Sequence, residues 1–132
     1  MALIGIGVDI VEVERMRRAI EDERSGRRFL SRVFTGGERD DCEKRGGRVE
    51  SYAVRFAAKE AVMKALADDS PFAMAWRDIE VASGPNGRPR VLLHGRAAER
   101  AARLGAGRIH LSLSHSAGMA LAEAVAERLG GG

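Results

Sequence analysis

The alternation of apolar and polar residues divides the chain into short strands and helices. Residues 2–8 form an apolar run with two glycines, which predicts a buried strand that approaches another backbone closely. Period-two alternation predicts further strands over residues 77–82, 89–93, 108–113 and 119–126. Turn signals at 83–87 and 114–118 join the second strand to the third, and the fourth to the fifth.

Helical periodicity marks the remaining segments. Helices are predicted over residues 13–23, 27–34, 36–44, 51–67 and 95–104. Thr35 and Glu38 have the spacing of a capping box, Ser51 is a plausible N-cap, and Gly105 ends the last helix. The alanine side of residues 119–126 would let the central helix, 51–67, pack closely. The predicted fold class is therefore α+β, an antiparallel sheet wrapped on one long central helix.

Composition limits the class of protein. A chain of 132 residues fits one domain, predicted over residues 1–129 with 130–132 as a disordered tail. The net charge of +3 and the few aromatic residues argue against a nucleic-acid partner. The single cysteine, Cys42, fits a reducing compartment, and no segment has the length of a membrane span. We expect a cytoplasmic protein with no membrane partner.

The central helix carries one carboxylate in an apolar setting. At about 100° per residue, Glu60 shares a side of the helix with Phe56 and Met63. A partly desolvated carboxylate needs a cation or a proton. Lys64, one turn further on, can supply that charge in an ordinary surface pair. A bound metal is the other interpretation.

Asp9 is a second carboxylate between apolar residues, at the end of the first strand. A cap of the next helix is one role for Asp9. One carboxylate from a strand and one from a helix also suit Mg²⁺, which takes oxygen ligands and often uses only one or two protein carboxylates plus substrate phosphates. His115, which follows Ser114 in a Ser-rich run, suits phosphate better than a hard metal. The polar residues together predict phosphate-ester chemistry.

Arginines crowd the two helices predicted over residues 13–23 and 27–34. They are interleaved with Met16, Phe29 and Leu30, and acidic residues thin out after Glu23. The seven are Arg15, Arg17, Arg18, Arg24, Arg27, Arg28 and Arg32. The pattern is typical either of a solvated helix face or of a docking surface for an acidic partner with apolar anchors.

Three blocks of the chain resemble the signature blocks of the holo-acyl-carrier-protein synthases, which are small bacterial-type 4′-phosphopantetheinyl transferases. The blocks are GIGVDI at 5–10, RFAAKEA at 55–61 followed by Lys64, and LSH at 113–115. The turn NGRP at 86–89 also matches. The resemblance covers nearly the whole chain, and its middle block is the most specific.

The resemblance implies an activity and a metal site. The family transfers the phosphopantetheine arm of coenzyme A to a serine of an acyl carrier protein and releases 3′,5′-ADP. By this resemblance, Asp9 and Glu60 would ligate Mg²⁺, and Glu60 would also be a catalytic residue. Lys64 would contact the phosphate that is attacked, as a second catalytic residue.

The resemblance also implies binding residues and partners. Arg55, Lys64, His115 and Ser116 would bind coenzyme A, and Lys59 is counted with them because it lies in the middle block. The carrier protein would dock on the arginine-rich helices, through Arg15, Met16, Phe29 and Arg32. Such synthases are usually homotrimers with active sites between subunits.

The sequence departs from the family at residues 67–71, where the usual glycines are missing and Asp68 and Asp69 stand instead. Two other functions remain as alternatives. A serine hydrolase around His115 lacks the Gly-x-Ser-x-Gly elbow. A non-enzymatic, arginine-rich module would bind an acidic protein or nucleic acid.

Overall fold

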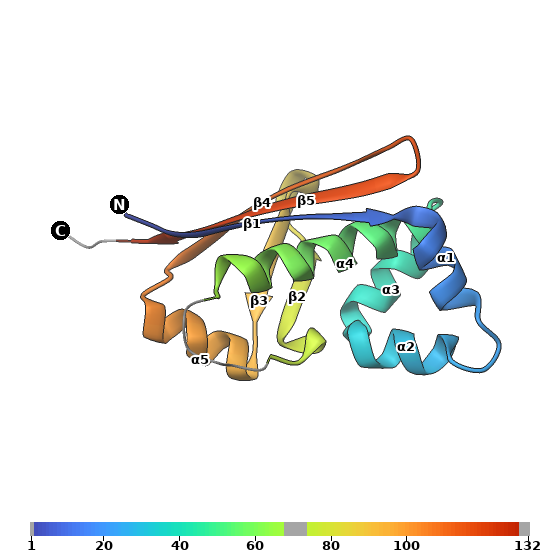
Figure 1. Ribbon diagram of the computed structural model, residues 1–132, viewed down its shortest axis with the longest axis horizontal. Helices are drawn as coiled ribbons and strands as arrows, with labels where there is room; N and C mark the ends of the chain where they lie inside the picture. The colour runs from blue at the N-terminus through green and yellow to red at the C-terminus, as the bar shows by residue number, and fades with distance from the viewer. Residues whose placement is uncertain (1, 68–73, 130–132) are drawn as a thin grey trace.

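A three-stranded antiparallel sheet lying along one long helix forms the body of the protein (Figure 1). The computed structural model describes residues 2–67 and 74–129. The sheet has the order β1 (Ala2–Glu12), β5 (Met119–Arg128), β4 (Arg108–Ser116). The helix is α4 (Arg48–Ala65), which runs beneath β1 and β5. The predicted α+β class, an antiparallel sheet on one central helix, is confirmed.

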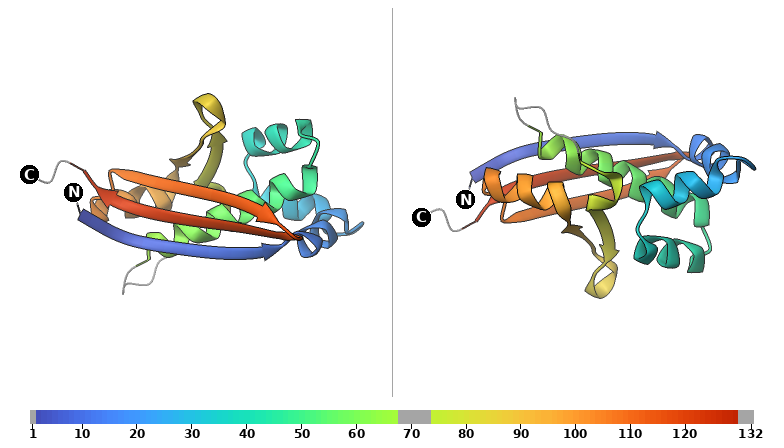
Figure 2. Two further views of the ribbon diagram at one scale, coloured as in Figure 1. Left: turned by 90° about the horizontal axis from the view of Figure 1, so that it is seen from above. Right: turned by 90° about the horizontal axis from the view of Figure 1, so that it is seen from below.

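Smaller elements cover the two ends of α4. Helices α1 (Val13–Glu21), α2 (Gly26–Val33) and α3 (Gly36–Lys44) lie at one end. A separate hairpin of β2 (Ile79–Ser83) and β3 (Pro89–Leu93), with helix α5 (Gly95–Leu104), lies toward the other. Figure 2 shows the hairpin projecting to one side of the sheet. Short 3₁₀ turns, η1 (Trp76–Asp78) and η2 (Pro85–Gly87), precede and close it.

Small residues bring β1 and β5 close to α4. A Cβ atom built on Gly5 would lie 2.0 Å from the carbonyl oxygen of Ala65, and one on Gly7 would lie 1.9 Å from that of Ala61. On β5 the side chains facing the helix are fully buried alanines: Ala120, Ala122, Ala124 and Ala126. The predicted close approach at the glycines and the predicted packing of the alanine side are both confirmed.

Most predicted elements are present, with corrections at their ends. α3 has its predicted bounds and its capping box, in which Thr35 Oγ1 accepts from the Glu38 amide (3.1 Å) and Glu38 Oε1 accepts from the Thr35 amide (2.9 Å). The prediction that Ser51 caps α4 was wrong: the helix begins one turn earlier and Gly47 is its N-cap. Packing of this first turn against the core outweighs a local capping preference, since Val49 is buried. Asp9 lies within β1 and does not cap α1.

The departure from the family at residues 67–71 and the tail predicted at 130–132 lie mostly outside the described residues. In residues 2–67 and 74–129, no helix has both the length and the apolar character needed to cross a membrane.

Candidate functional site

Asp9 and Glu60 meet between β1 and α4. Gly7 lets the strand approach the helix, and Asp9, two residues further along the same strand face, therefore points toward α4. The Asp9 side chain is only 13% exposed. Lys64 Nζ donates to the Val8 carbonyl (2.8 Å) and lies 3.3 Å from Asp9 Oδ1. The structure thus brings together three of the residues that the sequence singled out.

The electrostatics of this site favour a cation. Burial, together with the nearby Asp9 carboxylate, raises the pKa of Glu60 above its ordinary value. The positive charges of Lys64 and Arg15 act in the opposite direction without cancelling that shift. The negative charges of Asp9 and Glu60 repel each other, which disfavours ionising both carboxyl groups. A divalent cation between them would remove this repulsion.

A pocket of about 310 Å³ opens beside the two carboxylates. Met16, Phe29 and Phe56 form its apolar side, and Asp9 and Glu60 its acidic side. We call it the carboxylate pocket; its other lining residues are Ile10, Val11, Arg15 and Ala19.

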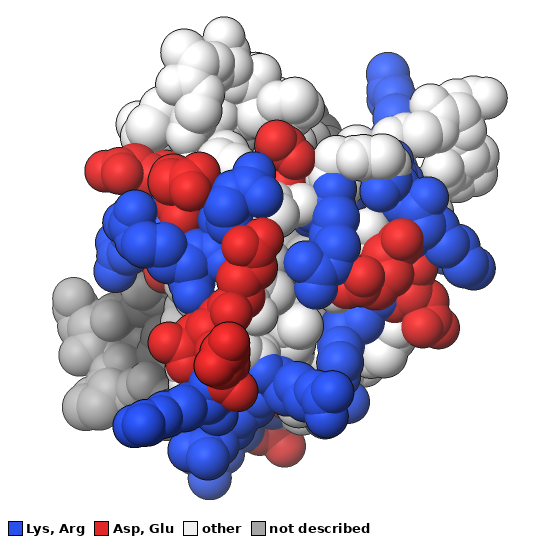
Figure 3. All heavy atoms as spheres, turned by 90° about the vertical axis from the view of Figure 1, so that its right-hand side faces the viewer, with Lys and Arg blue, Asp and Glu red and all other residues white. Residues whose placement is uncertain are grey.

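The predicted docking residues surround this pocket in different ways. Arg15 is an exposed lining residue, whereas Met16 lines the pocket and is 97% buried. Arg32 is exposed on α2 and does not line the pocket. Figure 3 shows basic side chains lying beside acidic ones at this end of the molecule.

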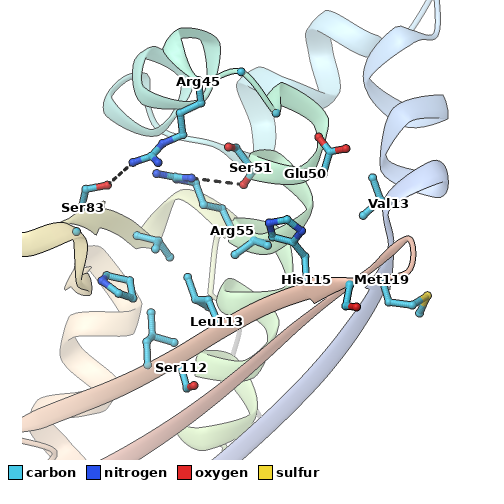
Figure 4. A pocket seen from close by; sticks show the side chains of 18 of the residues that line it. Val13, Arg45, Glu50, Ser51, Arg55, Ser83, Ser112, Leu113, His115 and Met119 are labelled. Carbon is cyan, nitrogen blue, oxygen red and sulfur yellow. Dashed lines mark hydrogen bonds between the residues drawn. The ribbon is translucent and has the colours of Figure 1, made fainter.

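A larger pocket, of about 1100 Å³, lies between the first half of α4, the hairpin and the end of β4 (Figure 4). Arg45, Arg55, His115 and Ser116 contribute polar groups to its lining. We call it the arginine pocket. Its hairpin side is formed by Val81, Ala82, Ser83, Gly87 and Pro89.

Two guanidinium groups in the arginine pocket are held by one carboxylate. Arg55 is 7% exposed and forms an ion pair with Asp41 through Nη2. Arg45 Nε lies 3.2 Å from Asp41 Oδ2, and Arg45 Nη2 donates to Ser83 Oγ (2.9 Å). Burial alone would raise the pKa of Asp41, but the charges of Arg55 and Arg45 hold this pKa below its ordinary value. The pocket therefore holds two guanidinium groups in fixed orientations, and Glu50 adds an acidic side chain to its lining.

Sequence reasoning missed Arg45, Asp41 and Ser83. Asp41 and Arg45 have the four-residue spacing of an ordinary helical ion pair, and their contacts with Arg55 and Ser83 form only when α3, α4 and the hairpin pack together. The one available signal was the position of Arg45 immediately before the Gly46-Gly47 helix stop, where a loop residue can turn toward a site.

Lys59 lines neither pocket, contrary to its grouping with the coenzyme-binding residues. Its side chain is fully buried, with Nζ 2.7 Å from Glu38 Oε1. It also donates to the carbonyls of Trp76 (3.1 Å) and Ile79. Burial lowers the pKa of Lys59, and the Glu38 charge only partly opposes that shift. An ammonium with all three donors occupied inside the core is not placed to bind a ligand phosphate.

The two pockets lie on different sides of α4. The carboxylate pocket is bounded by β1, α1 and α2, and the arginine pocket by β4 and the hairpin. Among the residues described, none lines both. Within one chain, the site of Asp9, Glu60 and Lys64 is therefore separated from Arg55, His115 and Ser116, with which the sequence predicts it to act.

Comparison with known proteins identifies the family of the chain. Residues 5–122 match the family model described as ACPS, 4′-phosphopantetheinyl transferase superfamily. A holo-[acyl-carrier-protein] synthase of Koribacter versatilis is 44% identical over 95% of this chain and 98% of its own length. One of Desulforudis audaxviator is 50% identical over 94% of this chain and 92% of its own.

Solved structures show the same fold. The holo-[acyl-carrier-protein] synthase of Neisseria meningitidis superposes with a TM-score of 0.83 at 33% identity, covering 96% of this chain and all of that one. The Helicobacter pylori enzyme in complex with coenzyme A gives 0.78 at 30% identity, covering 92% and 99%. The chain therefore belongs to the holo-[acyl-carrier-protein] synthase family of the 4′-phosphopantetheinyl transferase superfamily.

Proposed function

We propose that this protein transfers the 4′-phosphopantetheine group of coenzyme A to a serine hydroxyl of an apo acyl carrier protein and releases 3′,5′-ADP. The observation that carries the proposal is the meeting of Asp9, on a strand, with Glu60 and Lys64, on a helix 51 and 55 residues further along the chain. Two carboxylates beside an ammonium suit a pyrophosphate substrate with its counter-ion.

The residues present fit Mg²⁺. Asp9 and Glu60 would hold it, since Mg²⁺ keeps several waters and accepts one or two carboxylates plus substrate phosphates. The described residues contain no group of three or more histidine, cysteine or acidic side chains that could hold a metal, which argues against a zinc-type cage. When bound, Mg²⁺ would neutralise charge on the pyrophosphate of coenzyme A.

The chemical step follows from the groups at this site. The serine oxygen attacks the β-phosphorus of coenzyme A and forms a new P–O bond. The bond from that phosphorus to the bridging oxygen breaks, and the oxygen leaves on 3′,5′-ADP. Glu60, or a water that it orients, takes the serine proton. The Lys64 ammonium stabilises the charge that develops on the phosphate oxygens.

The arginine pocket suits the 3′-phosphate end of coenzyme A. Arg55 and Arg45 are oriented by Asp41, and His115 and Ser116 face the same space from β4 (Figure 4). Guanidinium groups bind phosphate oxygens through paired hydrogen bonds. Lys64 stays with the carboxylates, where it would contact the pyrophosphate.

The acidic carrier protein would dock over α1 and α2. Arg15 and Arg32 are exposed there, and the apolar side of the carboxylate pocket, with Met16 and Phe29, lies between their helices. This position would deliver the carrier serine to the carboxylates. Exposed basic residues around an apolar recess are typical of a docking surface for an acidic partner.

A homotrimer with shared active sites would reunite the two pockets. The sheet face directed away from α4 is apolar along β1, where Ile6 is 54% and Ile10 56% exposed, and continues onto Leu121 of β5. An apolar face of this kind is typical of a surface that another subunit covers. In a cyclic assembly, the arginine pocket of one copy would face the carboxylate pocket of the next.

The activity is tested by incubating an apo acyl carrier protein with this protein, coenzyme A and Mg²⁺ and measuring the carrier by mass spectrometry. We expect the mass of one phosphopantetheine arm to be added to the carrier, and no addition without Mg²⁺. No transfer, combined with thermal stabilisation by nucleic acid alone, would favour the arginine-rich binding module instead.

Shared sites are tested by mixing two inactive variants. Asp9→Ala and His115→Ala should each lose most activity as pure assemblies. After co-refolding, random mixing in a cyclic assembly should restore about a quarter of the sites, because each complete site needs one residue from each chain. No recovery from a mixed trimer would mean that each chain carries a complete site.

A further inference from the structure

A buried ion pair ties together the elements that form the walls of the arginine pocket. Glu38, on α3, is 1% exposed. Its Oε1 accepts from Lys59 Nζ on α4 (2.7 Å) and from the Thr35 amide (2.9 Å). Its Oε2 accepts from the Val81 amide on β2 (2.8 Å). One carboxylate therefore contacts α3, α4 and the hairpin at once.

Lys59 completes the connection from the other side. Its remaining donors go to the carbonyls of Trp76 and Ile79, at the start of the hairpin. Both charged groups are fully hydrogen-bonded, which is the condition under which a buried pair is tolerated. Removing one partner alone would leave an uncompensated buried charge at this junction.

This junction is one of several contacts that hold the hairpin in position; the hydrogen bonds of Ser83 with Arg45 and Asp41 are others. β2 and β3 form a two-stranded sheet of their own, which is not hydrogen-bonded to the sheet of β1, β5 and β4. A second tie, from Thr35 Oγ1 to Glu80 Oε2 (2.9 Å), also runs from the start of α3 to β2. The hairpin lines the arginine pocket opposite Arg55, so its distance from α4 sets the width of that pocket.

We propose that Glu38 and Lys59 are positioning residues for coenzyme binding, which set the width of the arginine pocket without touching the coenzyme. The proposal rests on the proposed function and assigns a different role to a residue of the RFAAKEA block. Neither side chain lines a pocket, and both are buried. The pair also lies apart from the carboxylates of Asp9 and Glu60, so it should affect coenzyme binding more than the chemical step.

The test compares Glu38→Gln, Lys59→Met and the double variant with the wild-type protein. KM for coenzyme A, kcat, and the Kd of 3′,5′-ADP by calorimetry are measured below the melting range of each variant. We expect Glu38→Gln to raise KM and Kd about fivefold or more, with kcat at saturation within about twofold. The double variant should be no worse than either single variant, because it removes both charges together.

Two other outcomes would overturn the proposal. If Lys59 bound the coenzyme directly, Glu38→Gln would leave KM unchanged or lower it, because a negative charge near the phosphates is lost. The double variant would then be as impaired as Lys59→Met. If the pair only stabilised the fold, Glu38→Gln would lower the melting temperature and leave KM and Kd unchanged.

Two further variants serve as a stability control and as a substitute for the charge variants. Ile20 is buried on α1 and lines neither pocket, so Ile20→Ala should destabilise the fold without changing the arginine pocket. The KM of this variant for coenzyme A should equal that of the wild type. If the charge variants do not fold, Thr35→Asp carries the test, because an aspartate side chain still accepts from the Glu38 amide as an N-cap but cannot donate to Glu80. We expect about a twofold rise in KM, and an unchanged KM overturns the proposal. Absence of transfer by the wild-type protein would refute the proposed function, whereas the Kd of 3′,5′-ADP would still test the positioning role.

Discussion

The substitution Gly7→Ala should separate β1 from α4 and disable the carboxylate site. The added Cβ would lie 1.9 Å from the Ala61 carbonyl oxygen and 2.8 Å from its carbonyl carbon. Real Cβ atoms essentially never approach another atom within 3.0 Å, so the strand or the helix must move by about 1 Å. The obstacle is backbone on a buried helix and cannot rotate away as a side chain would.

The cost can be estimated from similar overpacked sites. Inserting a methyl group into a packed core typically costs about 1–3 kcal/mol, and more where neighbours cannot yield. Gly7 belongs in the upper part of this range, because β1 is paired along its length with β5 and cannot shift alone. A loss of about 3 kcal/mol corresponds to a melting temperature lower by about 10 °C for a domain of this size. Asp9, two residues on, would move with the strand.

Thermal unfolding and the transferase assay measure the two effects. Gly36→Ala is the matched control, because no atom lies within 4 Å of its added Cβ at the start of α3. That control should be as stable as the wild type or slightly more so. The companion change Ala61→Gly should not rescue Gly7→Ala, because the clash is with the carbonyl group. A melting temperature for Gly7→Ala within about 2 °C of the wild type would refute the close-packing argument.

Three further predictions concern the site, the docking surface and the thiol. Glu60→Gln should lower kcat about 100-fold or more at unchanged melting temperature, and near-normal turnover would exclude Glu60 from the chemistry. Arg15→Glu and Arg32→Glu should raise KM for the carrier protein in a salt-dependent manner, with KM for coenzyme A unchanged. A carrier KM equal to that of the wild type would mean that the carrier docks on another surface. Burial raises the pKa of Cys42 to about 11, so at pH 8 only about 0.1% is thiolate, and iodoacetamide should label it only after denaturation. Rapid labelling of the native protein would show that this part of the core opens.

Local patterns predicted those parts of the fold that depend on neighbouring residues. The Thr35 capping box, the turn before β3 and the Gly105 stop after α5 all follow from side chains a few residues apart, and all three are present. The start of α4 did not follow, because burial of its first turn outweighs the capping preference of Ser51.

The site was predictable in its residue types and less so in its assembly. Asp9, Glu60 and Lys64 were identified because a carboxylate between apolar residues needs a compensating cation or proton. Such a carboxylate can be recognised from the sequence alone. Lys59 is one residue from Glu60 and looked like a member of the same site. A helix turns by about 100° per residue, however, so the two side chains point in different directions, one into the core and one toward β1.

By itself, the sequence determined the family and most of the secondary structure, and it singled out Asp9, Glu60 and Lys64, since each of these rests on spacing along the chain. Tertiary structure decided the rest. The pairing of Asp41 with Arg55 and the burial of Lys59 against Glu38 join residues of different elements. The separation of the two pockets by α4 is likewise a property of packing. These contacts depend on which helix faces the hairpin and at what distance, and that choice is made by burial of the whole core rather than by any local pattern.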